Sequence, residues 1–354
     1  MPVIVPLLSG AARHLSTGKA ADTAAAMDRP IVIAGAGSIG CFVGGLLAEA
    51  GRNVRLLARS RIAEELGTNG LLLTSFEGWE VRLAPGAVPV LTDPAEALKD
   101  ASLVLVTVKS GSTEEMAGLT AAHAPPGAAV VSLQNGLDNA ERLGALLPSR
   151  RVLAGMVPFN VLHLGNGRFH KGTSGGILVD DVADVVAILD GKRLPVAGHP
   201  DMKAVLAGKL LLNLNNALNA LSGLTLHEQL ADRRWRRLLA RCQDEALAVF
   251  ARHGIRPWSM GPLPAPWMPR VLRLPTFLFR RLAIVRIDRT ARSSMAEDLA
   301  RGRPTEIAEL QGKVVVLAQA LGLPAPANQA VLDAVRAAEK AGSGSPQSVP
   351  ENLA

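Results

Sequence analysis

One stretch of the sequence has the glycine spacing of a phosphate-binding turn. Gly35, Gly37 and Gly40 follow the apolar run Ile31–Ala34, and an apolar helical pattern over Cys41–Ala50 comes next. The first glycine allows a tight turn, the second lets the backbone approach a pyrophosphate, and the third lets helix and strand pack closely. Free N–H groups and the positive end of the helix dipole would then bind the phosphate charge. The pattern predicts a dinucleotide site; the alternative is a turn that serves packing alone. Its residues would be Gly35, Ala36, Gly37, Ser38, Ile39 and Gly40.

The next strand bears on which dinucleotide binds. In sites for the non-phosphorylated cofactor, an Asp or Glu near the end of this strand binds the ribose 2′-hydroxyl. Here the strand predicted over Asn53–Arg59 ends in Ala58, Arg59, Ser60 and Arg61. Because a guanidinium and a hydroxyl bind a 2′-phosphate that a carboxylate would repel, we expect NADP(H) rather than NAD(H). The alternative is that both arginines are ordinary surface residues.

A second set of polar residues interrupts an apolar helical pattern. Lys209, Asn213 and Asn216 are spaced i, i+4, i+7 and therefore share one helix face. Buried polar groups cost free energy unless they have partners. A lysine with a pKa lowered by burial can donate a proton, while neighbouring amides orient a polar substrate. Equally, Lys209 could extend its ammonium to solvent while the asparagines satisfy backbone groups.

Two further polar clusters lie later in the chain, at Ser293-Ser294 and at Thr305-Glu306. Their simplest interpretation is structural. Ser294 could cap or begin a helix, and Thr305-Glu306 after Pro304 could be a helix start.

The elements that must position these residues change character near residue 200. Before it, strands alternate with helices, which predicts a doubly wound parallel sheet over residues 29–200. Lys109 and Asn135 follow the buried strands Leu103–Val108 and Ala128–Leu133, at the edge where such sheets bind ligands. Further strands are expected in Leu71–Thr74, Glu80–Leu83, Val152–Val161 and Gly176–Val179.

Beyond residue 200 the patterns are helical, which predicts an all-helical domain over residues 201–340. Helices are expected in Asp201–Leu226, Glu228–His253, Thr290–Arg301 and Thr305–Leu321. We expect residues 1–28 to be a disordered or non-native extension and residues 341–354, rich in Ser, Gly and Pro, to be a disordered tail. Pro262–Arg289 mixes aromatic residues with arginines; a helix pair with a basic face is the simplest interpretation, and a mobile cover or a membrane or partner contact are alternatives.

Composition excludes several classes of protein. With 354 residues, 48% hydrophobic and 19% charged, the chain can bury a sizeable core. The net charge of +7 favours anionic ligands, but scattered arginines and 3% aromatic residues argue against nucleic acid. Cys41 and Cys242 form neither a disulfide framework nor a metal set, so we expect a reducing compartment, a cytoplasmic location and no metal. Four asparagines within Leu210–Leu226 make that apolar run a poor membrane span.

Taken together, five motifs in this order resemble the ketopantoate reductases (2-dehydropantoate 2-reductases). The resemblance covers nearly everything from Ile31 to about Ala338. The motifs are Gly35–Gly40, Val106-Thr-Val-Lys109, Gln134-Asn-Gly136, Gly208-Lys-Leu210 with Asn213, and Ser293-Ser-Met295 with Asp298, Gly302-Arg303 and Thr305-Glu-Ile307.

The resemblance implies a Rossmann domain followed by a helical domain like the C-terminal domain of 6-phosphogluconate dehydrogenase, with the site in the cleft between them. It implies hydride transfer from NADPH to the C2 carbonyl of 2-dehydropantoate, giving (R)-pantoate for pantothenate and coenzyme A biosynthesis. Lys209 falls on the general acid and Glu306 on a glutamate that helps position the lysine, the substrate hydroxyl or the cofactor. The other implied positions are Lys109, Asn135 and Val161 at the cofactor, Arg59 at the 2′-phosphate, and Asn135, Asn213 and Ser294 at the substrate, with Asn216 as a substitute substrate contact.

The chain departs from the family pattern at Ala217, where the family usually has a second asparagine, and at Ala308 and Gln311. These departures leave open a different 2-oxo acid or carbonyl substrate. A non-catalytic nucleotide sensor is a further alternative, although a sensor needs neither Lys209 nor Glu306. The partners expected are therefore a small 2-oxo acid and NADPH/NADP⁺, without nucleic acid or a membrane span, and a homodimer is compatible with the sequence.

Overall fold

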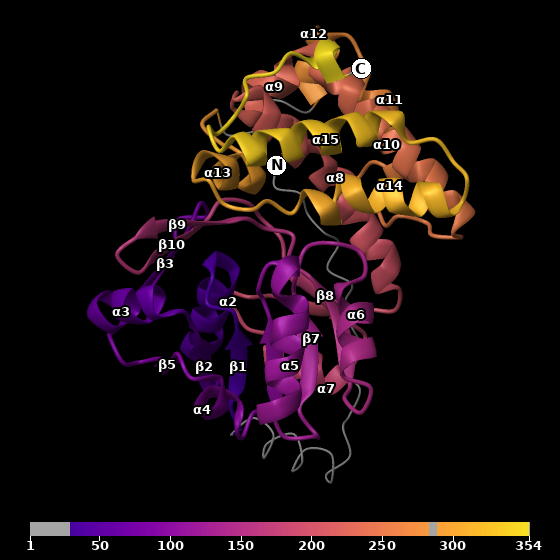
Figure 1. Ribbon diagram of the computed structural model, residues 1–354. Coiled ribbons are helices and arrows are strands. Elements are labelled where there is room, and N and C mark those ends of the chain that lie inside the picture. Colours follow the sequence, from indigo (N-terminus) through magenta and orange to yellow (C-terminus); the bar gives the residue numbers. More distant parts are fainter. Residues whose placement is uncertain (1–28, 283–288, 354) are drawn as a thin grey trace. The chain divides into compact units, whose positions relative to one another are not determined.

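The computed structural model describes residues 29–282 and 289–353. The expectation for residues 1–28 lies outside the described residues. The chain divides into two compact units, drawn in Figure 1. The first contains the residues up to Gln134 and Asp138–Met202, and the second contains Asn135–Leu137 and Lys203–Ala354. The sequence placed the boundary at residue 200, and it did not anticipate that Asn135 groups with the helical unit.

The first unit is built on an eight-stranded sheet in the order β12-β11-β8-β7-β6-β1-β2-β5. All neighbouring strands are parallel except β8 and β11, which are antiparallel. The order reverses between β1 and β6, the kind of position where open α/β sheets bind ligands. The strands are β1 (Ile31–Ala34), β2 (Val54–Leu57), β5 (Val90–Leu91), β6 (Leu103–Val106), β7 (Ala129–Ser132), β8 (Val152–Met156), β11 (Ile177–Asp180) and β12 (Val196–His199).

A smaller four-stranded sheet, in the order β4-β3-β10-β9, belongs to the same unit. Its strands are β3 (Leu71–Ser75), β4 (Glu80–Leu83), β9 (Val161–Gly165) and β10 (Arg168–Lys171). The stretch Val152–Val161, expected as one strand, is therefore β8 and the start of β9, which belong to different sheets.

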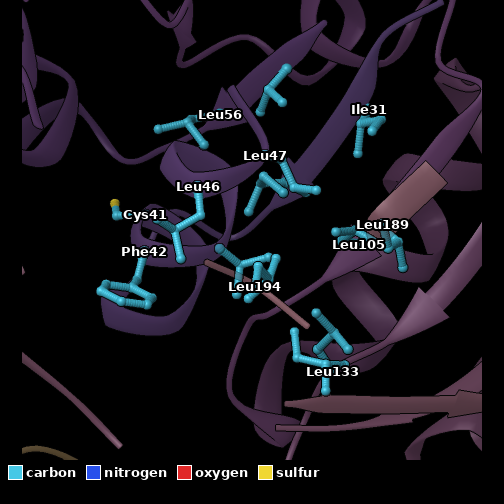
Figure 2. Packing of buried hydrophobic residues seen from close by; sticks show 14 of the residues in the cluster. Ile31, Cys41, Phe42, Leu46, Leu47, Leu56, Leu105, Leu133, Leu189 and Leu194 are labelled. Atoms are coloured by element: carbon cyan, nitrogen blue, oxygen red, sulfur yellow. The ribbon is translucent and has the colours of Figure 1, made fainter. Parts of the chain in front are cut away.

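Helices cover both faces of the larger sheet, as a doubly wound fold requires. Along β1, Ile31 and Ile33 face one hydrophobic cluster while Val32 and Ala34 face another, so the strand is buried on both sides. Figure 2 shows the first cluster, in which Phe42, Leu46 and Leu47 of α2 pack against the sheet. The helices of this unit are α2 (Ser38–Glu49), α3 (Ser60–Asn69), α4 (Pro94–Leu98), α5 (Thr113–His123), α6 (Asn139–Leu146) and α7 (Ala183–Leu189), with the 3-10 turn η1 (Ser110–Ser112).

The second unit is helical throughout its described elements, which confirms the predicted fold class of a parallel α/β domain followed by a helical domain. The long helix α8 begins at Met202 and supplies a buried apolar face that includes Leu211 and Leu214. The elements are α8 (Met202–Ser222), α9 (Leu226–Ala231), α10 (Arg233–Arg252), η2 (Ala265–Trp267), α11 (Met268–Leu272), α12 (Thr276–Leu282), α13 (Ser294–Ala300), η4 (Ile307–Glu309), α14 (Gln311–Ala320), α15 (Pro326–Ala341) and η5 (Pro350–Leu353).

Two sequence expectations for the second unit were too coarse. The helix expected over Glu228–His253 is two helices, because Asp232 ends α9 and caps α10 by accepting a hydrogen bond from the Arg234 amide. The helix expected over Thr305–Leu321 is the turn η4 followed by α14, since Leu310 leaves the helical conformation between them.

The expectation of a disordered tail over residues 341–354 was wrong. The described tail packs on its own unit: the Ser348 amide and the Ser345 hydroxyl both donate to the Leu221 carbonyl. Leu353, in η5, is only 6% exposed. Composition rich in Ser, Gly and Pro did not reveal that these residues satisfy backbone groups at the end of α8.

Candidate functional site

The turn between β1 and α2 needs glycine at two of the three positions that the sequence singled out. Gly35 has a φ of +116°, which L side chains rarely adopt, and a Cβ there would lie 2.7 Å from the Val108 side chain. A Cβ on Gly40 would lie 2.2 Å from the Gly35 carbonyl oxygen, so any side chain would push the turn away from the helix. Around Gly37, by contrast, a Cβ would meet nothing within 4 Å. The turn is therefore closed on its protein side and open on the other, which fits a dinucleotide pyrophosphate lying over Gly37.

The first turn of α2 adds backbone donors to this open side. The first four N–H groups of a helix have no partner within the helix, and the helix dipole favours an anion beside them. The α2 first turn contains no acidic residue that would compete, and Gly37 at its N-cap has no side chain. Ala36, Ser38 and Ile39 complete the turn, so all six residues expected at the pyrophosphate lie in one loop-to-helix segment.

Thr107 fixes the turn from the neighbouring strand, a role that the sequence analysis did not assign. Its hydroxyl donates to the Gly35 carbonyl oxygen at 2.6 Å, and its amide donates to the Ala34 carbonyl oxygen at 3.0 Å. The signal was present in the sequence as the polar residue in Val106-Thr-Val-Lys109, directly after a buried strand. Lys109 follows it with an exposed side chain.

Arg59 and Val161 occupy less enclosed positions in the first unit. Arg59 is exposed, follows β2, and precedes the first turn of α3. No acidic residue lies in that first turn, so nothing there repels a phosphate. Val161 begins β9 and packs half-buried against the core.

A buried polar network lies directly beside Lys109 and Asn135 in the sequence. The Gln134 side-chain amide donates to the Thr113 hydroxyl at 2.9 Å, and the Asn139 side-chain amide donates to the Ser110 hydroxyl at 2.8 Å. The Ser132 hydroxyl donates to the side-chain carbonyl oxygen of Gln134 at 3.1 Å, and all five side chains are buried. The network holds the segments after β6 and β7 in one arrangement, and its members were not recognised as positioning residues from the sequence.

In the second unit, Lys209 lies on α8 with its side chain half-buried. Burial lowers the pKa of Lys209 to about 8, because removing the ammonium from water disfavours the charged form. The negative charge of Glu306 works in the opposite direction and raises the pKa. The lysine therefore exchanges its proton near neutral pH, as a general acid must.

Glu306 connects Lys209 with a third residue of the candidate site. The Asn135 side-chain amide donates to a Glu306 carboxylate oxygen at 2.8 Å. Asn135 belongs to the short segment Asn135–Leu137 that groups with the helical unit. The structure thus brings together Lys209, Glu306 and Asn135, which lie far apart in the sequence.

The asparagines of α8 divide into two pairs with different roles. Asn215 exchanges two amide hydrogen bonds with Gln229, and Asn219 binds the Leu224 carbonyl oxygen and the Ser293 amide. Asn213 and Asn216 are half-buried on the Lys209 face, and within residues 29–282 and 289–353 their side chains form no hydrogen bond. Asn215 and Asn219 therefore have a structural role, because their side chains bind groups of the same unit. Asn213 and Asn216, beside Lys209, remain available for a ligand.

Ser294 is the exposed first residue of α13, and its neighbour Ser293 is the cap. The Ser293 hydroxyl accepts from the Ala296 amide at 3.2 Å and donates to the Asn216 carbonyl oxygen at 3.0 Å. Ser293 therefore ties the start of α13 to α8, which leaves the Ser294 hydroxyl for another partner.

Comparisons with known proteins identify the family of this chain. The family model Ketopantoate reductase PanE/ApbA matches residues 31–184, and the model Ketopantoate reductase PanE/ApbA C terminal matches residues 201–339. The chain belongs to the ketopantoate reductase PanE/ApbA family. Members of this family are oxidoreductases, so the resemblance deduced from the five motifs is confirmed.

Individual relatives span nearly the whole of the family fold. A 2-dehydropantoate 2-reductase from Halobacterium salinarum is 30% identical over 88% of this chain and 99% of its own length. A PanE/ApbA family ketopantoate reductase from Ralstonia eutropha superposes with a TM-score of 0.76 at 29% identity, over 88% of this chain and 99% of that one. A D-mandelate dehydrogenase, solved with NADH and anilino(oxo)acetate, shares the fold at 20% identity with a TM-score of 0.73, over 88% and 99% of the two chains.

Among the described residues, no helix is long and apolar enough to cross a membrane. Within the same residues, no group of three or more His, Cys, Asp or Glu side chains is arranged to hold a metal ion. Cys41 and Cys242 are buried, and burial raises the pKa of the Cys41 thiol to about 12, which leaves it unreactive.

Proposed function

We propose that this protein reduces 2-dehydropantoate to (R)-pantoate with NADPH, with Lys209 as the proton donor. The observation that carries the proposal is a half-buried lysine with a pKa of about 8, beside a glutamate that accepts a hydrogen bond from Asn135. The name of the Halobacterium salinarum relative, a 2-dehydropantoate 2-reductase, supports this choice of substrate.

The chemistry needs a proton donor that stabilises negative charge on the carbonyl oxygen. Bound NADPH supplies a hydride to C2 of the substrate. As that bond forms, the C2 oxygen gains negative charge, which the Lys209 ammonium stabilises before it transfers a proton to the oxygen. Glu306 keeps Lys209 protonated near neutral pH, since its negative charge offsets part of the burial.

The remaining site residues bind and orient. Gly35, Ala36, Gly37, Ser38, Ile39 and Gly40 would hold the pyrophosphate, with Lys109, Asn135 and Val161 along the rest of the cofactor. We assign Arg59 to the 2′-phosphate, because its guanidinium is exposed at the end of β2. Asn213 and Asn216 would bind the substrate hydroxyl and carbonyl groups, and Ser294 would donate to its carboxylate.

A second candidate keeps the chemistry and changes the substrate. Ala217 stands where the family usually has an asparagine and is fully buried on α8, so it offers no polar group. The family fold also occurs in a D-mandelate dehydrogenase that binds anilino(oxo)acetate, a different oxo acid. Reduction of another 2-oxo acid would leave the roles of Lys209 and Glu306 unchanged.

Mixing purified protein with NADPH and 2-dehydropantoate, and following the near-ultraviolet absorbance of the cofactor, tests the proposal. Stoichiometric oxidation of NADPH with formation of pantoate supports it. Turnover with another 2-oxo acid but not with 2-dehydropantoate would favour the second candidate. No turnover with any member of a 2-oxo acid panel, although NADPH binds, would leave only a non-catalytic nucleotide-binding role.

We also propose a cytoplasmic location and a homodimeric assembly. An enzyme that uses NADPH and has two buried, unpaired cysteines suits the cytoplasm. A ketopantoate reductase from Staphylococcus aureus that shares the fold is described as dimeric, and we propose a homodimer here.

A further inference from the structure

The part of the second unit around α11 and α12 concentrates positive charge. Residues 233–281 contain eleven arginines, no lysine, and only Asp244 and Glu245 as acidic residues. The proposed reductase chemistry uses none of them. Such a charge imbalance creates an electrostatic field that attracts polyanions.

This basic segment is fixed to α10 by one fully buried guanidinium. Arg236 donates to the carbonyl oxygens of Leu272 and Leu274 at 3.1 and 3.0 Å and to the Thr276 hydroxyl at 3.2 Å. Its guanidinium also lies 4.5 Å from the centre of the Phe279 ring. Arg236 of α10 therefore binds both the end of α11 and the start of α12, and it fixes the short connection between these two helices.

The opposite faces of these helices present large apolar side chains to solvent. Phe277 is 67% exposed, Trp267 is 54% exposed and Leu278 is 38% exposed. Burying Phe279 on the inner face of α12 turns Phe277 and Arg281 outward, since they lie two residues away on either side. Exposed side chains of this size in a small area mark an interaction site.

Arginines accompany the exposed apolar groups. The Arg270 guanidinium lies 5.1 Å from the centre of the Trp267 ring, a cation–π contact that holds the ring at the surface. Arg280 and Arg281 are exposed on α12 beside Phe277. We call Trp267, Arg270, Phe277, Leu278, Arg280 and Arg281 the arginine–aromatic surface.

We propose that the arginine–aromatic surface docks the protein on anionic lipid bilayers, as a peripheral contact. Tryptophan and phenylalanine side chains enter the interface between head groups and acyl chains, while arginines bind lipid phosphates and carboxylates. This chemistry matches the large apolar and cationic side chains that η2, α11 and α12 expose.

Charge argues against a second copy of the chain as the occupant. A two-fold interface places the same surface of each subunit against the other, so arginines would face arginines. Nucleic acid would satisfy the charge and stack on aromatic rings, but it offers no apolar environment for Leu278. A bilayer satisfies both the charge and the aliphatic surface.

The test is co-sedimentation of the full chain with vesicles. We expect binding to vesicles of equal parts phosphatidylcholine and phosphatidylglycerol, and none to vesicles of phosphatidylcholine alone. The double variant Arg280→Glu/Arg281→Glu should bind at least about 30-fold more weakly, since each lost arginine accounts for about fivefold (about 1 kcal/mol) near an anionic surface and each glutamate adds repulsion. Phe277→Ser should also weaken binding, although it leaves the charge unchanged.

A matched control separates this surface from the general positive charge. Lys99→Glu/Lys192→Glu changes the net charge equally at exposed sites of the first unit and should keep binding within about twofold. All variants should keep the wild-type melting temperature and turnover, because the substituted residues are exposed and outside the proposed active site. Vesicles should shift the tryptophan emission of the wild type to the blue, and Trp267→Phe should abolish most of that shift.

Three outcomes would overturn the proposal. One is that the wild type does not sediment with the anionic vesicles. Another is equal loss of binding in the control and the Arg280→Glu/Arg281→Glu variant. The third is normal vesicle binding by Phe277→Ser combined with a change in its oligomeric state by sedimentation velocity, which would identify the surface as a contact between copies of the chain.

Discussion

The glycine turn of the first unit and the polar cluster of the second differ in the groups that we propose for function. At Gly35–Gly40 the proposed phosphate donors are backbone amides, and the space beside them depends on the absence of a side chain at Gly37. At Lys209 and Glu306 the proposed functional groups are side chains, and burial lowers the pKa of Lys209. Adding atoms to the turn should therefore weaken cofactor binding, whereas removing a charge from the cluster should lower turnover.

Removing the Lys209 ammonium should have the largest effect on turnover. Lys209→Ala should lower kcat by about 10²–10⁴-fold, because general acid catalysis contributes that much. NADPH affinity, measured by fluorescence titration, should change by less than about threefold. The melting temperature should not fall, because the variant removes a charged group whose burial costs free energy. Wild-type turnover by Lys209→Ala would remove the lysine from the mechanism.

Adding a methyl group to the turn should affect binding instead. In Gly40→Ala the Cβ would lie 2.2 Å from the Gly35 carbonyl oxygen, so the turn must open. We expect NADPH affinity to fall by at least about 100-fold and stability to fall by about 2–4 kcal/mol, as at other strained sites. Fluorescence titration and thermal melting measure the two effects.

Gly37→Ala is the matched variant, because nothing lies within 4 Å of its Cβ. It should melt like the wild type and still lose cofactor affinity, since the methyl group occupies the space above the turn. Normal NADPH binding by Gly37→Ala would show that the pyrophosphate does not lie there.

The Arg59 side chain should determine which dinucleotide the first unit prefers. Arg59→Ala should weaken NADPH binding by about 10–100-fold and NADH binding by less than about twofold, because a hydrogen bond to a charged group contributes about 1.5–3 kcal/mol. Titration with both cofactors measures the ratio. Arg61→Ala, at an exposed site whose guanidinium lies 3.6 Å from Glu65, provides the control. Equal losses for the two cofactors would mean that Arg59 does not bind the phosphate.

The buried network next to Asn135 should show a smaller effect that links packing to turnover. Gln134→Met removes the acceptor of the Ser132 hydroxyl and the donor to the Thr113 hydroxyl, and should cost about 1–3 kcal/mol of stability. It should also lower kcat/KM by about 3–10-fold, because Asn135 is the next residue.

Gln243→Met gives the comparison for that variant. Gln243 is buried and donates to the Leu211 carbonyl oxygen, so its loss should cost similar stability without changing kcat/KM. If both variants lose activity equally, the network has no positioning role beyond general stability.

The sequence predicted the backbone part of the site better than the side-chain part. The glycine turn is local: Gly35 and Gly40 are needed for steric reasons within the protein, and the space above Gly37 is open. The α/β alternation and the helical second unit were predicted from hydrophobic periodicity. The continuous apolar run of β1, for example, reflects the burial of this strand on both faces. Helix boundaries such as the break at Asp232 depend on a capping contact and were missed.

Contacts between distant segments could not be deduced from spacing. The hydrogen bond from Asn135 to Glu306 joins residues that are 171 positions apart, and only the family resemblance suggested that both were functional. Periodicity placed Asn213 and Asn216 on the Lys209 face of α8, but it could not show that Asn215 and Asn219 bind groups of their own unit. The packing of the tail on the Leu221 carbonyl depends on a tertiary contact in the same way.

The pH dependence of kcat/KM for 2-dehydropantoate tests the proton-donor role of Lys209 most directly. Only the protonated lysine can donate, so kcat/KM should be constant below about pH 8 and fall about tenfold for each further pH unit. In Glu306→Gln the fall should begin at lower pH, because the charge that raises the Lys209 pKa is gone. A profile that stays flat to pH 10 in protein that remains folded, or an identical profile in Glu306→Gln, would contradict the account.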